Sequence, residues 1–243
     1  MPRADGRRAD QLRPVTIRRR FTAAPPGSVL IACGGTQVLC TASFETGVPR
    51  WREGSGLGWV TAEYDMLPAS TSQRRRRTRE RVDGRTQEIQ RLIGRTMRAV
   101  VAMDLLGEHT IVLDCDVLQA DGGTRTASIT GAYVALVDAV RWGRRQQRLD
   151  GDPLKGAVAA VSVGRVGGRM LLDLDYREDS AAGVDLNVAM TDGGEFVEVQ
   201  GSGEEASFSA DELDCMLRLA GRGIRRLLAA QRTALADREE RRG

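Results

Sequence analysis

The apolar positions in the first half of the chain follow the pattern of strands joined by tight turns. SVLIACGGTQVLCTASF, residues 28–44, contains two apolar runs separated by Gly34 and Gly35. Two glycines between such runs are typical of a β-hairpin turn. WVTAEY, residues 59–64, predicts another strand, and TIVLDCDVL, residues 110–118, has the branched apolar content of a buried one.

Helical spacing of apolar residues predicts three helices. The first is expected from about Thr86 to Asp104. Another face of this helix carries three arginines at spacings of four and three, Arg91, Arg95 and Arg98. The second helix follows the buried strand and runs to about Trp142. Ser209 and Glu212 form a capping box that opens the last helix.

Four short apolar segments separated by Gly or Asp turns lie between the last two helices. They are AVAAVSVG, RMLLDLDY, VDLNVAMT and GEFVEVQG, residues 157–164, 169–176, 184–191 and 194–201. This spacing is typical of a meander. The whole order of elements predicts an α/β (α+β) fold with mixed strand pairing, in one domain over residues 1–243.

Composition adds a cellular setting. The chain has 243 residues, is 41% hydrophobic, and contains no apolar run near the roughly 18 to 20 residues that a membrane span needs. The charged start, MPRADGRRADQLRP, lacks the apolar stretch of a signal peptide. A soluble, cytoplasmic protein without membrane contact is therefore expected. The four cysteines are far apart without a CxxC pair, which indicates reduced core residues.

The net charge of +3 hides an uneven distribution. Lys155 is the only lysine among 36 Lys and Arg residues, a bias that genome composition explains. The placement of the arginines is more informative, because one short segment contains seven of them: Arg74, Arg75, Arg76, Arg77, Arg79, Arg81 and Arg85. Only Glu80 and Asp83 offset them. A strong local positive potential is expected there.

The junction between the buried strand and the second helix has the composition of an anion site. Gly122 and Gly123 allow an anion to approach the main chain, and a helix start offers N–H groups and the positive end of its dipole. Arg125 can hold two phosphate oxygens with its planar fork. Three hydroxyls can cap the helix or bind ligand oxygens: Thr124, Thr126 and Ser128. The alternative is an ordinary capped helix start with Arg125 facing water.

Known nucleotide motifs are missing from this junction. Neither GxxxxGK[ST] nor GxGxxG occurs there, so it predicts a phosphate site without the apparatus of an ATPase or a dinucleotide enzyme. GRTQEIQRLIGR, residues 84–95, also places glycine, threonine and Arg85 at a helix start. Arg85 and Arg125 would converge on one anion if both helix starts face the same cleft.

The segment LDLDYREDSAAGVDLNVAMT, residues 172–191, is acidic. Its carboxylates surround two expected strands: Asp173, Asp175, Glu178, Asp179 and Asp185. Clustered carboxylates can hold Mg²⁺, although turn-forming aspartates and surface ion pairs explain the same pattern. His109 is the only histidine, and the cysteines have no histidine nearby in the sequence. A histidine base or an activated cysteine nucleophile is therefore not expected. The arginines, main-chain amides, hydroxyls and carboxylates that are left suit a nucleophile that is already an anion and needs positioning more than deprotonation.

Together these segments resemble the ribonuclease PH family of phosphate-dependent 3′ to 5′ exoribonucleases, over nearly the whole chain. The resemblance rests on DGRRADQLRPVTI, GWVTAEYDMLPAS, GRTQEIQRLIGRTMRAVV, DCDVLQADGGTRTASITGAYVAL, EDSAAGVDLNVAMT and FVEVQGSGEEASFS, in the family's order. It implies a fold of the ribosomal protein S5 domain 2-like class and a homo-hexameric ring of three dimers. It also implies that inorganic phosphate attacks RNA 3′ ends, including those of tRNA precursors, and releases nucleoside diphosphates in a reversible reaction.

The resemblance also implies roles for particular residues. Its phosphate ligands correspond to Arg85, Gly123, Thr124 and Arg125. The carboxylates near the metal, Mg²⁺ or Mn²⁺, correspond to Asp179 and Asp185, and Asp179 as a general acid stays an alternative. The arginines of residues 74–81, Arg74, Arg75, Arg76, Arg77, Arg79 and Arg81, are suited to a tRNA body through phosphate contacts.

Three other functions fit the sequence less well. A non-catalytic RNA-binding ring subunit would not need Arg85, Arg125, Asp179 and Asp185 together. Polynucleotide phosphorylase repeats a related domain, whereas this chain holds one copy without an S1 or KH extension. A small-molecule phosphorylase would leave the arginine run unexplained.

Overall fold

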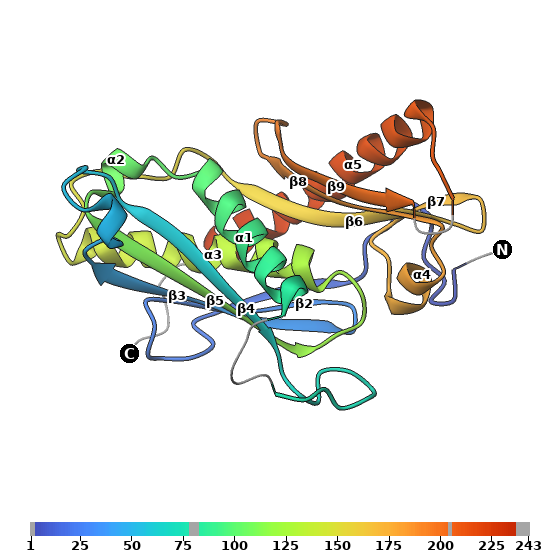
Figure 1. Cartoon of the computed structure of the whole chain (residues 1–243), viewed down its shortest axis with the longest axis horizontal. Coiled ribbons are helices and arrows are strands. Elements are labelled where there is room, and N and C mark those ends of the chain that lie inside the picture. Colours follow the sequence, from blue (N-terminus) through green and yellow to red (C-terminus); the bar gives the residue numbers. More distant parts are fainter. Residues whose placement is uncertain (1–2, 78–82, 204–205, 237–243) are drawn as a thin grey trace.

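The chain folds into two sheets with a long helix between them (Figure 1). The computed structural model describes residues 3–77, 83–203 and 206–236. Within these residues one sheet has five strands, in the order β1-β2-β3-β5-β4, and the other has four, in the order β7-β6-β8-β9. The strands are β1 Val15–Arg19, β2 Gly27–Cys33, β3 Thr36–Thr46, β4 Trp59–Met66, β5 His109–Gln119, β6 Val158–Val166, β7 Arg169–Leu172, β8 Val184–Thr191 and β9 Phe196–Gly203. The helices are α1 Gly84–Ala99, α2 Met103–Leu106, α3 Thr124–Arg145, α4 Tyr176–Ser180 and α5 Ala210–Ala236, with a 3-10 turn at Arg50–Arg52.

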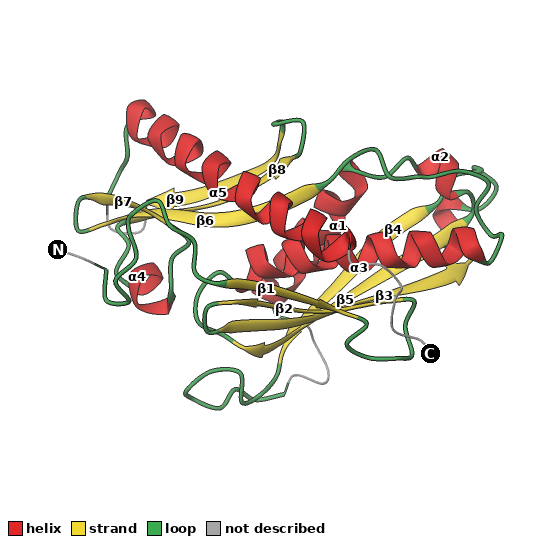
Figure 2. Cartoon of the chain, turned by 180° about the vertical axis from the view of Figure 1, so that it is seen from behind, coloured by secondary structure: helices red, strands yellow, loops and turns green. Residues whose placement is uncertain are grey.

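Helices α1 and α3 pack against one face of the first sheet (Figure 2). Its strands alternate between buried and half-buried residues, as a sheet covered on one side must. Strand β4 runs parallel to β5 whereas the other pairs are antiparallel, so the sheet is mixed, as predicted. Apolar side chains of β2 and β5, including Ile31 and Leu113, are fully buried in this core.

Helix α3 connects the two sheets. It contacts β2 and β3 on one side and β6 on the other, so 17 of its residues are buried. Small residues such as Gly131 permit this, because a Cβ there would lie 2.7 Å from the Ile31 side chain. Helix α5 covers the second sheet through Ile224, Leu227 and Leu228. The start of α3 is thereby fixed between the sheets.

Several expectations from the sequence are confirmed. The hairpin of β2 and β3 turns at Gly34–Gly35, and Gly34 has a φ of 57°. The capping box is present: Ser209 N–H donates to Glu212 Oε2 at 2.8 Å, and Glu212 N–H donates to Ser209 Oγ at 3.2 Å. None of the helices in the described part of the chain has the length and apolar content that a membrane crossing needs.

Three expectations are wrong. The first helix ends at Ala99 rather than near Asp104, because Val101 bridges to Leu154 and Ala102 N–H donates to Pro153 O. The four late strands are not a simple meander, because β6 lies between β7 and β8. Cys33, Cys40 and Cys115 are buried, but Cys215 is exposed on α5.

The face of β4 and β5 opposite the helices is acidic. Glu63 lies beside Asp114, and Asp65 beside Asp116, in the parallel register. Burial and these like charges raise the pKa of Asp116 from 3.8. The folded protein therefore holds this proton more tightly than the unfolded chain, so ionisation of Asp116 lowers stability as pH rises.

Asp116→Asn is accordingly expected to raise Tm at pH 7, with a smaller gain as pH falls toward 3.8. Thermal melts across that range, beside the exposed Asp104→Asn on α2, check this. An equal gain at every pH would contradict the electrostatic cause.

Candidate active site

The junction between β5 and α3 is a sharp backbone corner. Gly122 and Gly123 have φ values of 73° and 66°, the left-handed region that favours glycine. A Cβ on Gly122 would lie 2.5 Å from Leu174 O, so the close approach of the segment before α4 also requires glycine. Gly123 is the N-cap of α3, and no side chain among the described residues caps the helix there. The first N–H groups of α3 are thus suited to an anion.

None of the three hydroxyls of the corner caps α3, and their binding of ligand oxygens stays a prediction. Thr126 Oγ1 donates to Gly123 O at 2.9 Å, and Ser128 Oγ donates to Thr124 O at 2.9 Å. Both bond back to the helix instead of capping it. Thr124 Oγ1 accepts from the buried Tyr64 hydroxyl at 2.9 Å. Tyr64, on β4, therefore fixes the Thr124 side chain.

Arg125 does not face water, contrary to the alternative interpretation. Its side chain is 17% exposed, and Nη1 donates to Gln200 Oε1 at 2.7 Å. The same nitrogen lies 3.2 Å from Glu88 Oε2, and Gln200 Nε2 donates to Glu88 Oε1 at 3.1 Å. This triangle ties together α1, α3 and β9. Glu88 and Gln200 are site residues that the sequence reasoning missed.

Arg85 is exposed in the first turn of α1, whose N-cap Asp83 accepts from Thr86 N–H at 2.7 Å. Burial, the largest effect, raises the pKa of Tyr64, while its hydrogen bond to Thr124 and the nearby arginine charges oppose that rise. Glu88, the ion-pair partner of Arg125, lies three residues after Arg85 on α1. The structure thus brings Arg85 and Arg125 to the same end of the molecule, and their binding of a shared anion stays a prediction.

Asp185 lies on β8, on the face of the second sheet that looks away from α5. Val184 and Leu186 are buried under α5, so the alternating Asp185 and Asn187 occupy the other face. In the register of β8 with β9, Asp185 is opposite Ser202, and Asn187 is opposite Gln200. Ser202 Oγ donates to Asp185 Oδ1 at 3.3 Å. Only the Leu186–Gly201 pair lies between the pair that contains Asp185 and the pair that contains Gln200, the hydrogen-bond partner of Arg125.

Asp179 lies on the exposed surface of α4, six residues before Asp185. Its N–H donates to Asp175 O at 2.9 Å, and its carbonyl accepts from Ala182 N–H at 3.2 Å. The acidic segment is otherwise structural: Asp175 caps α4, and Glu178 accepts from the buried Arg3. Asp173, Asp175 and Glu178 of the predicted carboxylate cluster therefore hold the fold together.

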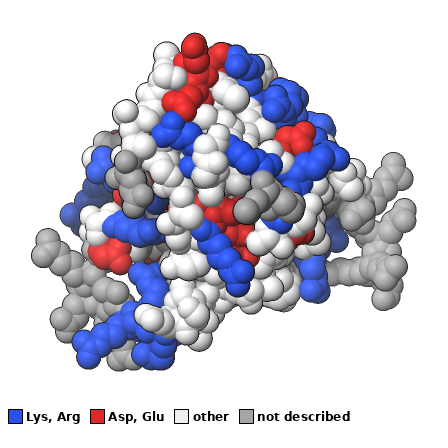
Figure 3. All heavy atoms as spheres, turned by 90° about the vertical axis from the view of Figure 1, so that its right-hand side faces the viewer, with Lys and Arg blue, Asp and Glu red and all other residues white. Residues whose placement is uncertain are grey.

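The basic segment leads into α1. Arg74, Arg76 and Arg77 are exposed, and Arg75 N–H donates to Pro68 O at 2.8 Å. Arg75 also pairs with Asp83, the N-cap of α1, at 3.7 Å. Arg79 and Arg81 lie outside the described residues. Figure 3 shows basic atoms spread around a central acidic group at the end of the molecule that carries α4.

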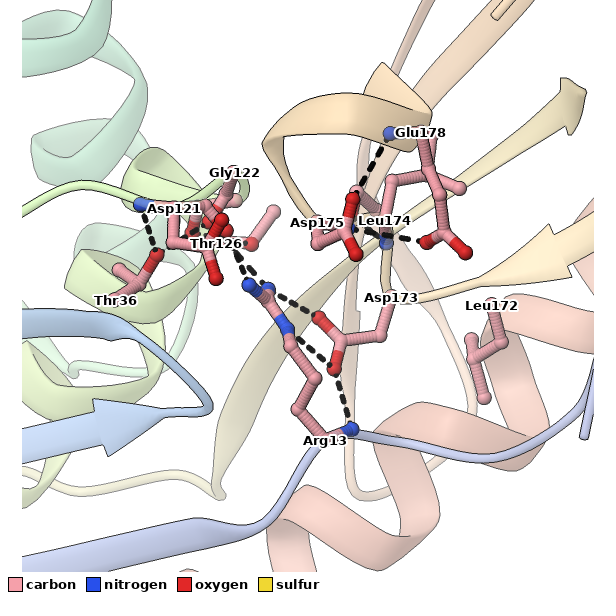
Figure 4. Close-up of polar contacts among 12 residues, drawn as sticks. Arg13, Thr36, Asp121, Gly122, Thr126, Leu172, Asp173, Leu174, Asp175 and Glu178 are labelled. Atoms are coloured by element: carbon pink, nitrogen blue, oxygen red, sulfur yellow. Dashed lines mark hydrogen bonds and ion pairs between the residues drawn. The ribbon is translucent and has the colours of Figure 1, made fainter. Parts of the chain in front are cut away.

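A buried network behind the corner was also missed. Arg13 forms an ion pair with Asp173 and donates to main-chain carbonyls of the corner, and Thr36 donates to Gly122 O there as well (Figure 4). Arg13 and Asp173 are 160 residues apart, and nothing local marks either as buried.

Comparison with known proteins identifies the family. Residues 11–141 match the model of domain 1 of the 3′ exoribonuclease family, and residues 156–223 match domain 2. The chain belongs to the 3′ exoribonuclease family. Proteins called ribonuclease PH from Bifidobacterium longum and Corynebacterium efficiens are each 59% identical to it, over 238 and 235 residues, and each match covers 96% of both chains.

Solved structures of lower sequence identity show the same fold. Rice Rrp46 has a TM-score of 0.79 at 20% identity, covering 96% of this chain and 99% of that one. A chain of the Archaeoglobus fulgidus exosome with RNA bound to the active site has a TM-score of 0.81 at 22% identity, covering 94% and 92%. The S5 domain 2-like class predicted from the sequence is confirmed.

The activity follows from membership of this family together with 59% identity to proteins called ribonuclease PH. The chain is a phosphate-dependent 3′ to 5′ exoribonuclease, with RNA as polymer and inorganic phosphate as co-substrate. The resemblance seen in the sequence is confirmed.

Proposed function

We propose that the corner before α3 binds the phosphate that attacks the RNA 3′ end, with Arg85, Gly123, Thr124 and Arg125 as its ligands. The supporting observation is the uncapped start of α3 behind two left-handed glycines, with the Arg125 guanidinium held by residues of α1 and β9. Main-chain N–H groups and guanidinium groups together provide the charge-assisted hydrogen bonds that phosphate prefers.

The reaction follows from this placement. A phosphate oxygen attacks the phosphorus of the last phosphodiester, a new P–O bond forms, and the bond to the 3′ oxygen of the preceding nucleotide breaks. The arginines neutralise the attacking anion, so two negatively charged groups can approach each other. Positioning and charge neutralisation supply most of the catalysis in such a transfer. The departing 3′ oxygen takes up a proton, and Asp179 is one candidate donor.

We propose that Asp179 and Asp185 hold Mg²⁺, with Mn²⁺ as the alternative ion. The described residues include no group of three or more His, Cys, Asp or Glu side chains arranged as a metal cage. That agrees with Mg²⁺, which takes one or two protein carboxylates, several waters and substrate phosphate oxygens. When bound, the ion would stabilise negative charge on the scissile phosphate and the 3′ oxygen. Asp179 has two proposed roles, metal ligand and general acid.

We further propose that the natural substrates are tRNA precursors and other RNAs with unpaired 3′ ends. The exposed arginines at residues 74–77 precede the α1 start that carries Arg85, so an RNA body held there would direct its 3′ end toward the corner. Arg79 and Arg81 are proposed to take part. We also propose a homo-hexameric ring, a trimer of dimers in the cytoplasm, in which residues 1–243 act as one domain.

The tRNA proposal predicts a separation of substrates. Replacing Arg74, Arg76 and Arg77 by Ser should weaken tRNA binding. The slope of the logarithm of the binding constant against the logarithm of the salt concentration should fall by up to about one for each lost contact between an arginine and an RNA phosphate. Phosphorolysis of a short unstructured oligonucleotide should change little. Binding across a salt series and product release measure both; equal losses on the two substrates would contradict a separate tRNA surface.

Product identity tests the proposed chemistry directly. The chain is incubated with tRNA bearing a short unpaired 3′ tail, with and without phosphate and Mg²⁺, and released nucleotides are resolved. Diphosphates that appear only with phosphate and Mg²⁺ support the proposal. Monophosphates without phosphate would make water the nucleophile, and tRNA binding without release would favour the non-catalytic ring subunit.

A further inference from the structure

Arg13 lies buried between the corner before α3 and the segment that leads into α4 (Figure 4). Its Nε and Nη2 donate to the carboxylate oxygens of Asp173 at 3.1 and 2.6 Å. Its Nη1 donates to Asp121 O, and its Nη2 also reaches Gly122 O at 3.4 Å. One planar guanidinium therefore holds two segments that are far apart in the sequence.

These hydrogen bonds fix the direction of the corner's N–H groups. In a planar trans peptide, the carbonyl of one residue and the N–H of the next point in opposite directions. Because Arg13 takes the carbonyls of Asp121 and Gly122, the N–H groups of Gly122 and Gly123 point away from it. Thr36 shares one of these peptides and holds the one before them: its Oγ1 donates to Gly122 O at 2.6 Å and accepts from Asp121 N–H, of the Ala120–Asp121 peptide, at 2.9 Å.

Asp173 adopts a conformation that needs this support. Its φ is 56°, which is unfavourable for a residue with a Cβ. Its carbonyl accepts from Arg3 Nη2 and Arg7 Nη1, each at 2.9 Å, while its carboxylate accepts from the Arg13 N–H at 2.7 Å. Since the next residue, Leu174, contacts Gly122 closely, the corner and the segment leading to Asp179 are set by one network.

We propose that Arg13 is a positioning residue for phosphate, acting through the main chain of Gly122 and Gly123. The proposal rests on the proposed binding of phosphate at this corner. Arg13 itself is buried and acts only by holding the peptides whose N–H groups face the anion. A lysine would keep the charge, but its single ammonium lacks the planar fork that spans Asp173 and two carbonyls.

Arg19 provides a matched control for Arg13→Lys. Arg13 lies just before β1 and Arg19 is the last residue of that strand. The Arg19 Nε and Nη2 donate to both carboxylate oxygens of Asp138, on α3, at 2.9 and 2.5 Å. Both ion pairs are largely buried. Arg13→Lys and Arg19→Lys should therefore lose comparable thermal stability.

Of these two variants, only Arg13→Lys should weaken the binding of phosphate. Its KM for phosphate in phosphorolysis, and for nucleoside diphosphate in the reverse reaction, should rise about tenfold or more, because small displacements of a binding group have large effects. Its kcat should change far less. A phosphate KM within about twofold of the Arg19→Lys value would overturn the positioning role.

Thr36 keeps the test decisive if Arg13→Lys does not fold. Thr36→Val removes two hydrogen bonds from the main chain of the corner, one of them to the Gly122 carbonyl that Arg13 also holds, without leaving a buried charge unpaired. Thr36→Ser keeps the hydroxyl. The valine variant should raise the phosphate KM and the serine variant should not; no difference between them would overturn the proposal. Arg125→Ala is measured alongside. If it leaves the phosphate KM unchanged, the proposed site itself is wrong; if it alone raises the KM, only the role of Arg13 is wrong.

Discussion

Arg125→Ala is expected to lower kcat/KM for phosphate by about 10²- to 10³-fold, the loss typical of removing one strong donor from a preorganised anion site. Two effects act together. The attacking phosphate loses a guanidinium, and Glu88 loses the cation that lies 3.2 Å from its carboxylate. An uncompensated carboxylate beside the site would then repel the incoming anion.

Arg95→Ala is the control for this variant. Arg95 lies on α1 two turns after Glu88 and pairs with Glu198 of β9 at 2.6 Å, but its side chain is 53% exposed. It should leave phosphorolysis within about twofold, as expected for an exposed ion pair. If both variants lost activity equally, the attachment of α1 to β9, and not the anion, would explain the effect. Glu88→Gln should lose less than Arg125→Ala, because it keeps a hydrogen-bonding side chain.

The fold was predictable where the signal is local. Gly34 and Gly35 mark the hairpin because a tight turn needs a left-handed residue at that point, and Ser209 marks the start of α5 because its hydroxyl reaches an N–H three residues on. The end of α1 was not predictable, because the bridge between Val101 and Leu154 joins residues 53 positions apart. The meander expected for the four late strands was wrong for the same reason, because β6 pairs with β8, which is distant in the sequence, as well as with β7.

For the site as well, local features could be predicted from the sequence and long-range contacts could not. Gly122 and Gly123 were recognised because two adjacent glycines before a helix indicate an unusual backbone. Arg13 was not recognised, because nothing in the sequence distinguishes a buried arginine from an exposed one in a chain with 36 Lys and Arg residues. Its partner Asp173 looked like one of several turn-forming aspartates. Long-range ion pairs are created by the fold, so a single sequence does not reveal them.

Asp185→Asn should lower kcat by about 10²-fold or more at a fixed Mg²⁺ concentration, because a neutral amide is a much weaker ligand for Mg²⁺ than a carboxylate. Asparagine keeps the shape of the side chain and an oxygen for the Ser202 hydroxyl, which now lies 3.3 Å from Asp185 Oδ1. The fold should therefore survive. The phosphate KM should change little, and more Mg²⁺ should be needed for half-maximal rate.

Asp192→Asn separates this effect from a general change in β8. Asp192 follows the other end of the strand and accepts from Ala157 N–H at 3.0 Å, which an amide oxygen can also do. It should leave the Mg²⁺ dependence unaltered. Asp179→Asn, measured in the same titration, distinguishes the two roles of that residue: a lost ligand shifts the Mg²⁺ requirement, whereas a lost general acid lowers kcat at every Mg²⁺ concentration and removes one limb of the pH profile. A normal Mg²⁺ requirement in both Asp179→Asn and Asp185→Asn would contradict metal binding by this pair.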